Sequence, residues 1–440
     1  MNERFAALAD ALAAPPDGTA GLAVGFSGGL DSTALLHALA ARAPAIPLRG
    51  VHVCHHLQPE AEAWAAHCRA FCQARGIAFT RLDVRVDGRA GGMEAAAREA
   101  RYEAIAAALA AGETFVTAHH RDDQAETFLL QALRGSGPDG LASMPSTAAF
   151  AERVHWRPWL EIARSDIRAY AARHELDWVE DPSNRDPHVA RSFIRSEVLP
   201  LIETRWPSAA ATLSRAATYA QEAREAIEAL ASADFDRVRD HAGTLSCEAL
   251  KALSFARRKQ AVRHWLARAG RDTPDHRQLA QILRLTEASL TASPCVRFAE
   301  TDVRLFDGRL HAMPALHTVP EVDAIAWTSR NTLHLPNECG SLVLESGDAA
   351  MPTLTVAFRR GGERLLQAGG THRRLKDVLR EARVAPWVRE RMPLIHLNGE
   401  LIVVPGIWRH PRMAQVSEHA IGTVVWRHRL MDGTLRVVRA

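Results

Sequence analysis

The sequence predicts an α/β protein with a Rossmann-like parallel sheet in its N-terminal domain, a helical middle domain and a small α+β C-terminal domain. Strand-like and helix-like stretches alternate over the first 135 residues, strand signals vanish between residues 208 and 285, and mixed signals follow residue 325. The chain has 440 residues, of which 47% are apolar and 24% charged, so two or three globular domains are expected. We predict domain limits of 1–207, 208–315 and 325–440.

The first domain consists of short apolar stretches, each followed by a helix-like stretch. The expected strands are 21–26, 48–54, 78–84 and 114–118, and the expected helices are 32–41, 59–75, 93–110 and 122–133. Such alternation is typical of βαβ units around a buried parallel sheet. Ligands bind these sheets at the carboxyl ends of the strands, so the residues that follow each strand are the candidates for a site.

The rest of the chain changes character twice. Ala, Arg, Glu and Leu recur at helical spacing over 208–285, and residues 295–313 then indicate two strands joined by an Asp307-Gly308 turn. A proline-punctuated stretch at 314–324 is the expected linker to the last domain. In that domain we expect strands at 341–344, 354–358 and 401–404, and a helix at 373–382.

Bulk composition excludes some classes of protein. The net charge is only +3, so a nucleic-acid partner is not predicted from total charge. No run of about 18 apolar residues occurs, so no membrane-spanning segment is expected. The six cysteines include no C-x-x-C pair, which indicates a reducing cytoplasm. Cys68 and Cys72, four apart on an expected helix, are interpreted as buried residues.

A glycine-rich loop after the first strand carries the main chemical signal. It reads S-G-G-L-D-S and comprises Ser27, Gly28, Gly29, Leu30, Asp31 and Ser32. The two glycines allow positive φ and close backbone approach, so amide groups at a helix N-terminus can face a pyrophosphate. No G-K-[ST] follows, which favours ATP with pyrophosphate as the leaving group. Asp31 is a candidate Mg²⁺ ligand, or alternatively a plain helix N-cap.

A second polar motif follows the fourth expected strand. The segment 119–127 reads H-H-R-D-D-Q-A-E-T, and Asp123 and Glu126 can share one helix face because they stand three residues apart. Two carboxylates close to ATP need a cationic partner. The same D-x-x-E spacing is also a capping pattern, which needs no ligand. The loop upstream favours the functional interpretation.

These two motifs resemble those of the PP-loop ATP pyrophosphatases, and further segments resemble the tRNA(Ile)-lysidine synthetases over nearly the whole chain. The further segments are H-V-C-H-H-L (52–57), E-A-A-A-R-E-A-R-Y (94–102), R-G-S-G-P-D-G-L (134–141), R-P-W-L (157–160), E-D-P-S-N-R-D (180–186) and R-S-F-I-R (191–195). The chain departs from the family at Cys54 (usually Asn or His), His56 (usually Gly) and Ser192 (usually Asn).

The resemblance implies a two-step reaction that consumes ATP and uses Mg²⁺. The wobble cytidine of tRNA(Ile) with a CAU anticodon is adenylated, and free L-lysine then displaces AMP to give lysidine. The resemblance also implies site roles: Asp31 for Mg²⁺, Asp123 and Glu126 for lysine or Mg²⁺, His120 as a proton acceptor, and Arg195 for holding the tRNA. The oligomeric state stays open, with a homodimer among the alternatives.

A basic segment near the C-terminus resembles the family's tRNA-binding domain. Residues 359–391 contain ten Lys or Arg and four Asp or Glu, a surplus of six positive charges that suits phosphate contact. Trp387 is interpreted as a core residue, with base stacking as the alternative. Competing functions are a PP-loop tRNA thiolase, an amidating synthetase for small molecules, and an RNA-binding scaffold without catalysis.

Overall fold

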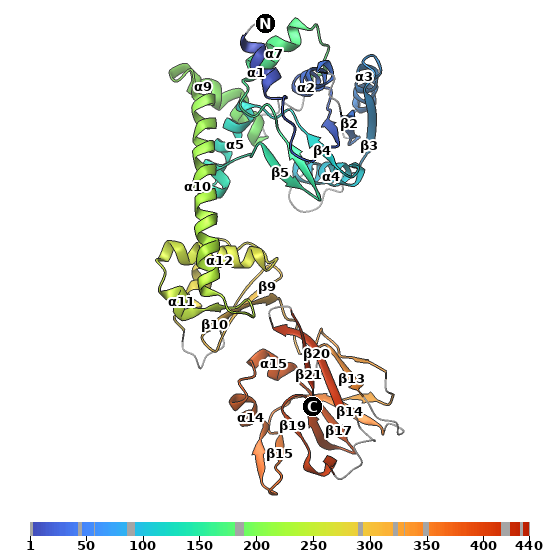
Figure 1. Ribbon diagram of the computed structural model, residues 1–440, viewed down its shortest axis with the longest axis vertical. Coiled ribbons are helices and arrows are strands. Elements are labelled where there is room, and N and C mark those ends of the chain that lie inside the picture. Colours follow the sequence, from blue (N-terminus) through green and yellow to red (C-terminus); the bar gives the residue numbers. More distant parts are fainter. Residues whose placement is uncertain are drawn as a thin grey trace. The chain divides into compact units, whose positions relative to one another are not determined.

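The computed structural model divides into two compact units, Met1–Ala226 and Ile227–Ala440 (Figure 1). It describes residues 3–42, 46–56, 58–85, 93–180, 189–288, 294–319, 324–329, 331–345, 352–414, 423–431 and 434–439. Among these residues, no helix combines the length and apolar character that crossing a bilayer would demand.

The first unit is built on a six-stranded sheet of order β3-β2-β1-β4-β6-β5. The strands are β1 (Gly21–Gly25), β2 (Leu48–Cys54), β3 (Ala78–Asp83), β4 (Glu113–Val116), β5 (Thr147–Phe150) and β6 (Arg153–Trp156). All neighbours pair in parallel except β5, which pairs antiparallel with β6. The predicted parallel sheet is confirmed, and the sequence analysis missed the edge hairpin β5–β6.

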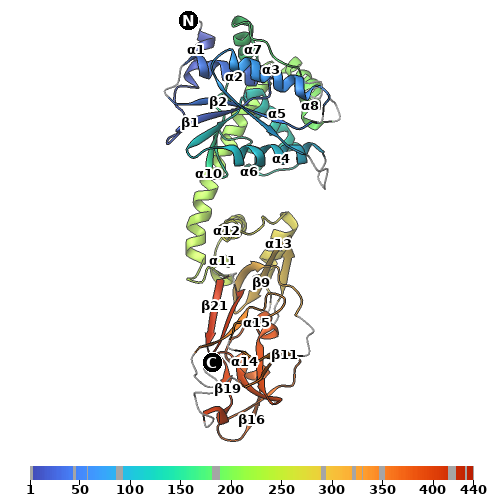
Figure 2. The same cartoon turned by 90° about the vertical axis from the view of Figure 1, so that its right-hand side faces the viewer.

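Helices cover both faces of this sheet, because successive residues of β1 point to opposite sides. Leu22 and Val24 pack in one core with α1 (Glu3–Asp10), α2 (Leu30–Ala41), α3 (Ala61–Gln73) and α7 (Arg164–Arg173). Ala23 packs in a second core with Phe115 and with Ile105 of α4 (Met93–Ala108). Figure 2 shows α2 and α3 on one side of the sheet and α4 on the other.

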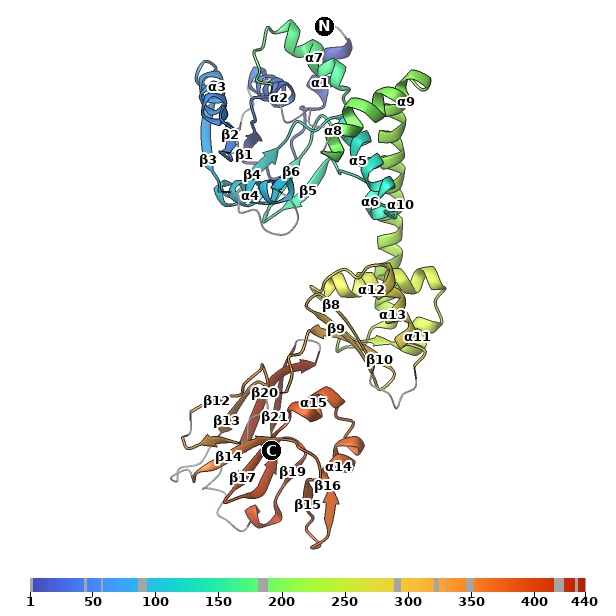
Figure 3. The same ribbon diagram turned by 180° about the vertical axis from the view of Figure 1, so that it is seen from behind.

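A smaller helical cluster adjoins the sheet. It contains α5 (Arg121–Leu133), α6 (Pro138–Leu141), α8 (Ala190–Phe193), a π-helical segment η2 (Ile194–Val198) and α9 (Leu199–Arg205). Ala125 of α5 packs against Ile194 and Leu199 in a small core of its own. Figure 3 shows α8 beside α5. This packing brings residues 190–198 close to the second polar motif, residues 119–127.

The second unit opens with helices, as predicted. The boundary between the units falls within α10 (Ala209–Val238), which α11 (Cys247–Lys251), α12 (Phe255–Arg268) and α13 (His276–Leu285) follow. Their core is shared with a sheet of β7 (Leu245–Ser246), β10 (Arg309–Pro314), β9 (Thr301–Phe306) and β8 (Cys295–Phe298). The predicted turn joins β9 to β10, with φ of 50° at Asp307 and 70° at Gly308.

The C-terminal part is an α+β arrangement, as predicted. One sheet has the order β11-β14-β17-β18-β19, a second β12-β13-β20-β21, and β15 pairs with β16. The strands are β11 (Ile325–Trp327), β12 (Leu333–His334), β13 (Ser341–Glu345), β14 (Leu354–Phe358), β15 (Arg364–Leu366), β16 (His372–Arg374), β17 (Pro393–Leu397), β18 (Glu400–Val404), β19 (Trp408–Arg409), β20 (Thr423–Met431) and β21 (Thr434–Arg439). The helices are α14 (Leu375–Glu381) and α15 (Pro386–Arg391).

Three details of this part bear on the sequence predictions. The expected helix at 373–382 begins only at Leu375, because the preceding residues pair with β15. Trp387 is 1% exposed and donates a hydrogen bond from Nε1 to the Leu430 carbonyl (2.7 Å), which confirms its core role. In the expected linker, Leu316 is buried in the C-terminal core, and residues 320–323 lie outside the described part of the chain.

Candidate active site

The glycine-rich loop forms the turn between β1 and α2. Gly28 has a φ of +83°, and a Cβ there would lie 2.9 Å from Cys68 Sγ, so both backbone and space require glycine. Gly29 has a φ of −76° and is the N-cap of α2, and a Cβ there would contact Ser27 Oγ at an ordinary 3.5 Å. The expectation of positive φ is therefore confirmed for Gly28 and wrong for Gly29.

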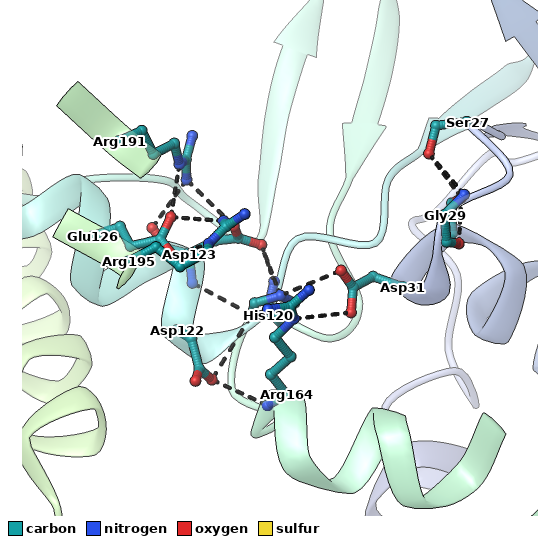
Figure 4. A network of polar contacts seen from close by, with 11 residues as sticks. Ser27, Gly29, Asp31, His120, Asp122, Asp123, Glu126, Arg164, Arg191 and Arg195 are labelled. Carbon is teal, nitrogen blue, oxygen red and sulfur yellow. Dashed lines mark hydrogen bonds and ion pairs between the residues drawn. The ribbon is translucent and has the colours of Figure 1, made fainter. Parts of the chain in front are cut away.

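The two serines of the loop hold its shape (Figure 4). Ser32 Oγ donates to the Gly29 carbonyl at 3.1 Å, and Ser27 Oγ accepts from the Gly29 amide at 3.3 Å. The two hydroxyl oxygens also lie 3.1 Å apart, within hydrogen-bonding distance. Leu30 anchors the start of α2 because its side chain is buried in the core. The loop is thus an ordered turn at a helix N-terminus, the arrangement that binds phosphate groups.

Asp31 lies in the first turn of α2 and does not cap the helix, so the N-cap alternative is wrong. Its side chain is 27% exposed, with Oδ2 3.7 Å from His120 Nε2 and Oδ1 3.6 Å from Arg164 Nε. Oδ1 is shielded from solvent and accepts no hydrogen bond from the described residues. A carboxylate oxygen with unused bonding capacity beside a phosphate-binding turn fits Mg²⁺, which one or two carboxylates and phosphate oxygens commonly hold.

His120 is the N-cap of α5, and its side chain is 1% exposed. Its Nδ1 accepts from the Asp123 amide (3.3 Å), and Asp123 Oδ2 accepts from the His120 amide (3.1 Å). The capping pattern considered from the sequence is therefore present. The neutral tautomer that fits this bond carries its proton on Nε2, 3.3 Å from Asp123 Oδ2.

Three carboxylates surround the His120 ring and set its charge. Burial of the imidazole disfavours its charged form, but Asp123, followed by Asp31 and Asp122, outweighs this effect and raises the pKa of His120. The pKa of Asp123 shifts the other way. Burial alone would raise it, whereas His120 and His119, with two nearby arginines, lower it below its ordinary value. Asp123 is therefore a carboxylate at neutral pH.

Two arginines from α8 and η2 clamp the acidic pair of α5. Arg195 donates from Nε to Glu126 Oε1 (2.6 Å) and from Nη2 to Glu126 Oε2 (2.8 Å) and Asp123 Oδ1 (3.0 Å). Arg191 donates from Nε to Glu126 Oε2 (2.8 Å). The Glu126 side chain is 1% exposed and each arginine side chain 29%. The structure thus joins Asp123, Glu126, Arg191 and Arg195 in one charge-balanced cluster beside His120.

The sequence analysis missed three contributors to this site. Arg191 was recognised only as part of the segment R-S-F-I-R. The four-residue spacing of Arg191 and Arg195 nonetheless suits pairing with the two carboxylates of D-x-x-E. Asp122 Oδ2 accepts from the Arg164 amide (3.0 Å), which ties the start of α7 to α5. Arg164 had no sequence signal. Arg195 lies in the π-helical segment η2, and Arg191 lies in α8 directly before it. π-Helical turns are often found at functional sites.

The other expected segments contribute buried or paired groups. His52 is buried, which lowers its pKa, and burial together with Arg101 lowers the pKa of His55 to about 4. Arg101 donates to His55 (3.1 Å), and the Arg98 guanidinium lies 5.0 Å from the Tyr102 ring centroid. Ser192, which stands where the family usually has Asn, is buried. Most of the segment 180–186 lies outside the described residues.

Comparison with known proteins covers all three parts of the chain. A PP-loop domain model matches residues 1–202, a TilS substrate binding domain model residues 245–311, and a TilS substrate C-terminal domain model residues 354–426. A U34-tRNA thiolase structure from Methanococcus maripaludis is 17% identical with a TM-score of 0.41, covering 50% of this chain and 79% of its own, a likeness too low to bear on function.

Curated relatives resemble the chain more strongly and over nearly its full length. The tRNA(Ile)-lysidine synthase of Serratia proteamaculans is 36% identical, covering 92% of this chain and 94% of the relative. That of Xanthomonas campestris is 41% identical, covering 89% and 90%. With these matches and the geometry of the loop and the charged cluster, the chain belongs to the tRNA(Ile)-lysidine synthase family.

Proposed function

We propose that this chain uses ATP to join free L-lysine to carbon 2 of the wobble cytidine of tRNA(Ile), forming lysidine, AMP and pyrophosphate. One observation carries the proposal. Asp31, which follows the phosphate-binding turn, lies 3.7 Å from His120, and His120 lies 3.3 Å from Asp123 of the charged cluster (Figure 4). A nucleotide on the turn and an amino acid at the cluster would therefore be neighbours.

The first proposed step is adenylation of the cytidine. The carbonyl oxygen at carbon 2 attacks the α-phosphorus, and the bond from that phosphorus to the bridging oxygen breaks, so that pyrophosphate leaves. Amides of the turn and the N-terminus of α2 would hold the phosphates. Mg²⁺, when bound at Asp31, would offset the charge that builds on the leaving group. The oxygen of the cytidine thereby becomes part of AMP, a good leaving group.

The second proposed step is attack of the lysine ε-amine on carbon 2, which expels AMP. With a reference pKa near 10.4, about one lysine molecule in 2,500 carries a neutral ε-amine at pH 7, a cost of roughly 4.6 kcal/mol. A carboxylate beside the ε-amine would stabilise the ammonium and increase this cost. The acidic pair therefore serves the reaction better if it binds another part of lysine.

The charge balance of the cluster suits the α-carbon end of lysine. Asp123 and Glu126 would bind the α-ammonium, and Arg191 and Arg195 would bind the α-carboxylate. Two carboxylates and two guanidiniums already neutralise each other, so a zwitterion adds no net charge. The same neutrality disfavours Mg²⁺ at this pair. The ε-amine would then extend towards the nucleotide.

His120 keeps its predicted role in modified form, whereas the role of Arg195 changes. The carboxylates that raise the pKa of His120 suit it to accept the proton that the amine loses. A second proton on Nδ1 would break its bond to the Asp123 amide, so proton uptake competes with the helix cap. Arg195 holds Glu126, and its partly exposed side chain would bind the α-carboxylate of lysine in place of the predicted tRNA contact.

The C-terminal basic segment is the proposed contact for tRNA(Ile) with a CAU anticodon. Seven of its cationic side chains are exposed: Arg360, Arg364, Arg373, Arg374, Lys376, Arg380 and Arg383. Exposed cations bind phosphates through release of counterions, so tRNA binding should weaken steeply with salt. A tRNA substrate and thiols without disulfide partners fit an enzyme that acts in the cytoplasm.

Product formation from ATP separates this function from its rivals. Free AMP should be released only when lysine and unmodified tRNA are both present, whereas one equivalent of pyrophosphate should be released with unmodified tRNA alone. A scaffold would release neither, and a thiolase would turn over with a sulfur donor in place of lysine. The thiolase is disfavoured because burial raises the pKa of Cys68 to about 12 and of Cys72 to about 11, leaving both as thiols.

A further inference from the structure

A second group of metal-ligating side chains lies at the carboxyl ends of β2 and β3, the two strands on one side of β1. Cys54 is the last residue of β2 and pairs in register with Asp83, the last residue of β3. His56 follows two residues later, and Glu62 lies in the first turn of α3, which packs on both strands (Figure 3). One ligand atom from each of these four residues lies within 4.8 Å of the others.

The distances match those of a tetrahedral metal site. His56 Nδ1 lies 3.7 Å from Cys54 Sγ and 3.7 Å from Glu62 Oε1. Ligands placed about 2.0–2.3 Å from a tetrahedral zinc ion stand about 3.3–3.8 Å apart. Both distances from His56 Nδ1 therefore fall in the range for zinc ligands, and the remaining pair, Cys54 Sγ and Glu62 Oε1, lies within 4.8 Å.

Asp83 completes the arrangement from the other side of the imidazole. His56 Nε2 lies 2.8 Å from Asp83 Oδ1, so the carboxylate can accept the Nε2–H and leave Nδ1 bare for a metal. Metal-bound histidines commonly have such a carboxylate partner. Arg81 donates to both oxygens of Glu62 (2.6 and 2.7 Å) and to Asp83 Oδ1 (2.7 Å), which orients both carboxylates.

The backbone at His56 supports a specific role for its side chain. Its φ is +53°, in the left-handed region that favours glycine over residues with a Cβ. The family that the sequence resembles usually has glycine here, so the imidazole of His56 is an addition in this chain. It belongs to the cluster of four ligand side chains.

We propose that Cys54, His56 and Glu62 bind one zinc-like divalent ion, with Asp83 holding the imidazole in place. A sulfur, nitrogen and oxygen donor set selects zinc over Mg²⁺, which prefers oxygen ligands. The Cys54 thiol loses its proton to solvent when the metal binds. The ion joins the ends of β2 and β3 to the start of α3, and a water molecule takes the fourth position. Its role is to stabilise this edge of the sheet.

Metal titration of the untagged full-length protein, stripped of metal beforehand, tests the proposal. Calorimetry should show one zinc equivalent bound, and cobalt(II) should give a thiolate-to-metal charge-transfer band. Cys54→Ser should abolish that band, and Asp83→Asn should weaken zinc binding about 10–100-fold. The exposed Cys295 lies in the other unit, so Cys295→Ser is the matched control and should bind zinc as the parent does.

His56→Gly keeps the test meaningful if a cysteine variant folds poorly. Glycine adopts a φ of +53° without strain, so this variant should fold while losing at least tenfold in zinc affinity. Zinc should also raise the melting temperature of the parent and not that of His56→Gly. The proposal is overturned if the parent binds no zinc, or if the parent and both Cys54→Ser and His56→Gly bind it equally.

Discussion

Replacing Glu126 by glutamine removes one charge from the buried cluster while nearly keeping the shape of the side chain. The carboxylate accepts three hydrogen bonds from guanidiniums, at 2.6, 2.8 and 2.8 Å. Each such charge-assisted bond contributes about 1.5–3 kcal/mol. In the glutamine variant, the NH₂ of the side-chain amide would face a guanidinium N–H, so two donors would meet without an acceptor. We therefore expect Glu126→Gln to reduce the free energy of unfolding of the first unit by about 2–4 kcal/mol.

That loss corresponds to a fall in melting temperature of roughly 4–16 °C for a unit of about this size. Two activity assays then separate lysine binding from adenylation. Transfer of AMP to tRNA without lysine should persist below the melting temperature, whereas incorporation of labelled lysine should be lost. Glu222→Gln, at an exposed position of α10, is the control for a neutralised glutamate. Full lysine incorporation by a Glu126→Gln protein of unchanged melting temperature would refute the reasoning.

Three further predictions concern the turn, the metal and pH. Gly28→Ala should destabilise the first unit by about 1–2 kcal/mol because Gly28 has a positive φ. Gly29→Ala should leave the melting temperature unchanged and weaken ATP binding. The two variants having equal effects on both the melting temperature and ATP binding would contradict this. Asp31→Asn should raise the Mg²⁺ concentration needed for half-maximal pyrophosphate release, and an unchanged Mg²⁺ titration would exclude its ligand role. Burial lowers the pKa of His119 from 6.5 to about 4, so the folded state binds fewer protons than the unfolded state in this pH range. This residue should therefore lower the free energy of unfolding by up to about 1.4 kcal/mol per pH unit as the pH drops from 6.5 to 4. In pH-dependent melting curves, His119→Gln should flatten this fall, and an unchanged slope would contradict the assignment to His119.

Much of the first unit could be predicted from the sequence because its central strands, β1 and β4, are short, largely buried segments and helix-like stretches separate the strands. The expected strand 48–54 coincides with β2, and the expected helix 93–110 with α4 to within two residues. The hairpin of β5 and β6 was missed because each strand has only four residues, and R-V-H-W in β6 lacks an apolar run. An edge hairpin of this kind is specified by its pairing with β4, which the local sequence does not reveal.

The candidate site was predictable in its residue types and less so in its partners. Spacing alone placed Asp123 and Glu126 on one face of α5, and the structure confirms that they converge. Their pairing with Arg191 and Arg195 depends on packing of α8 and η2 against α5, contacts between residues 65 and 69 positions apart. Sequence spacing reports neighbours within one element and says little about such long-range contacts.

The central claim is that the turn at Gly28 and Gly29, with Asp31, binds the phosphates of ATP. A crystal structure with a non-hydrolysable ATP analogue and Mg²⁺ tests it most directly. We expect the β- and γ-phosphates on the amides of this turn, with Mg²⁺ held by the Asp31 carboxylate. Phosphates bound elsewhere on the sheet, or a turn closed against them, would contradict it.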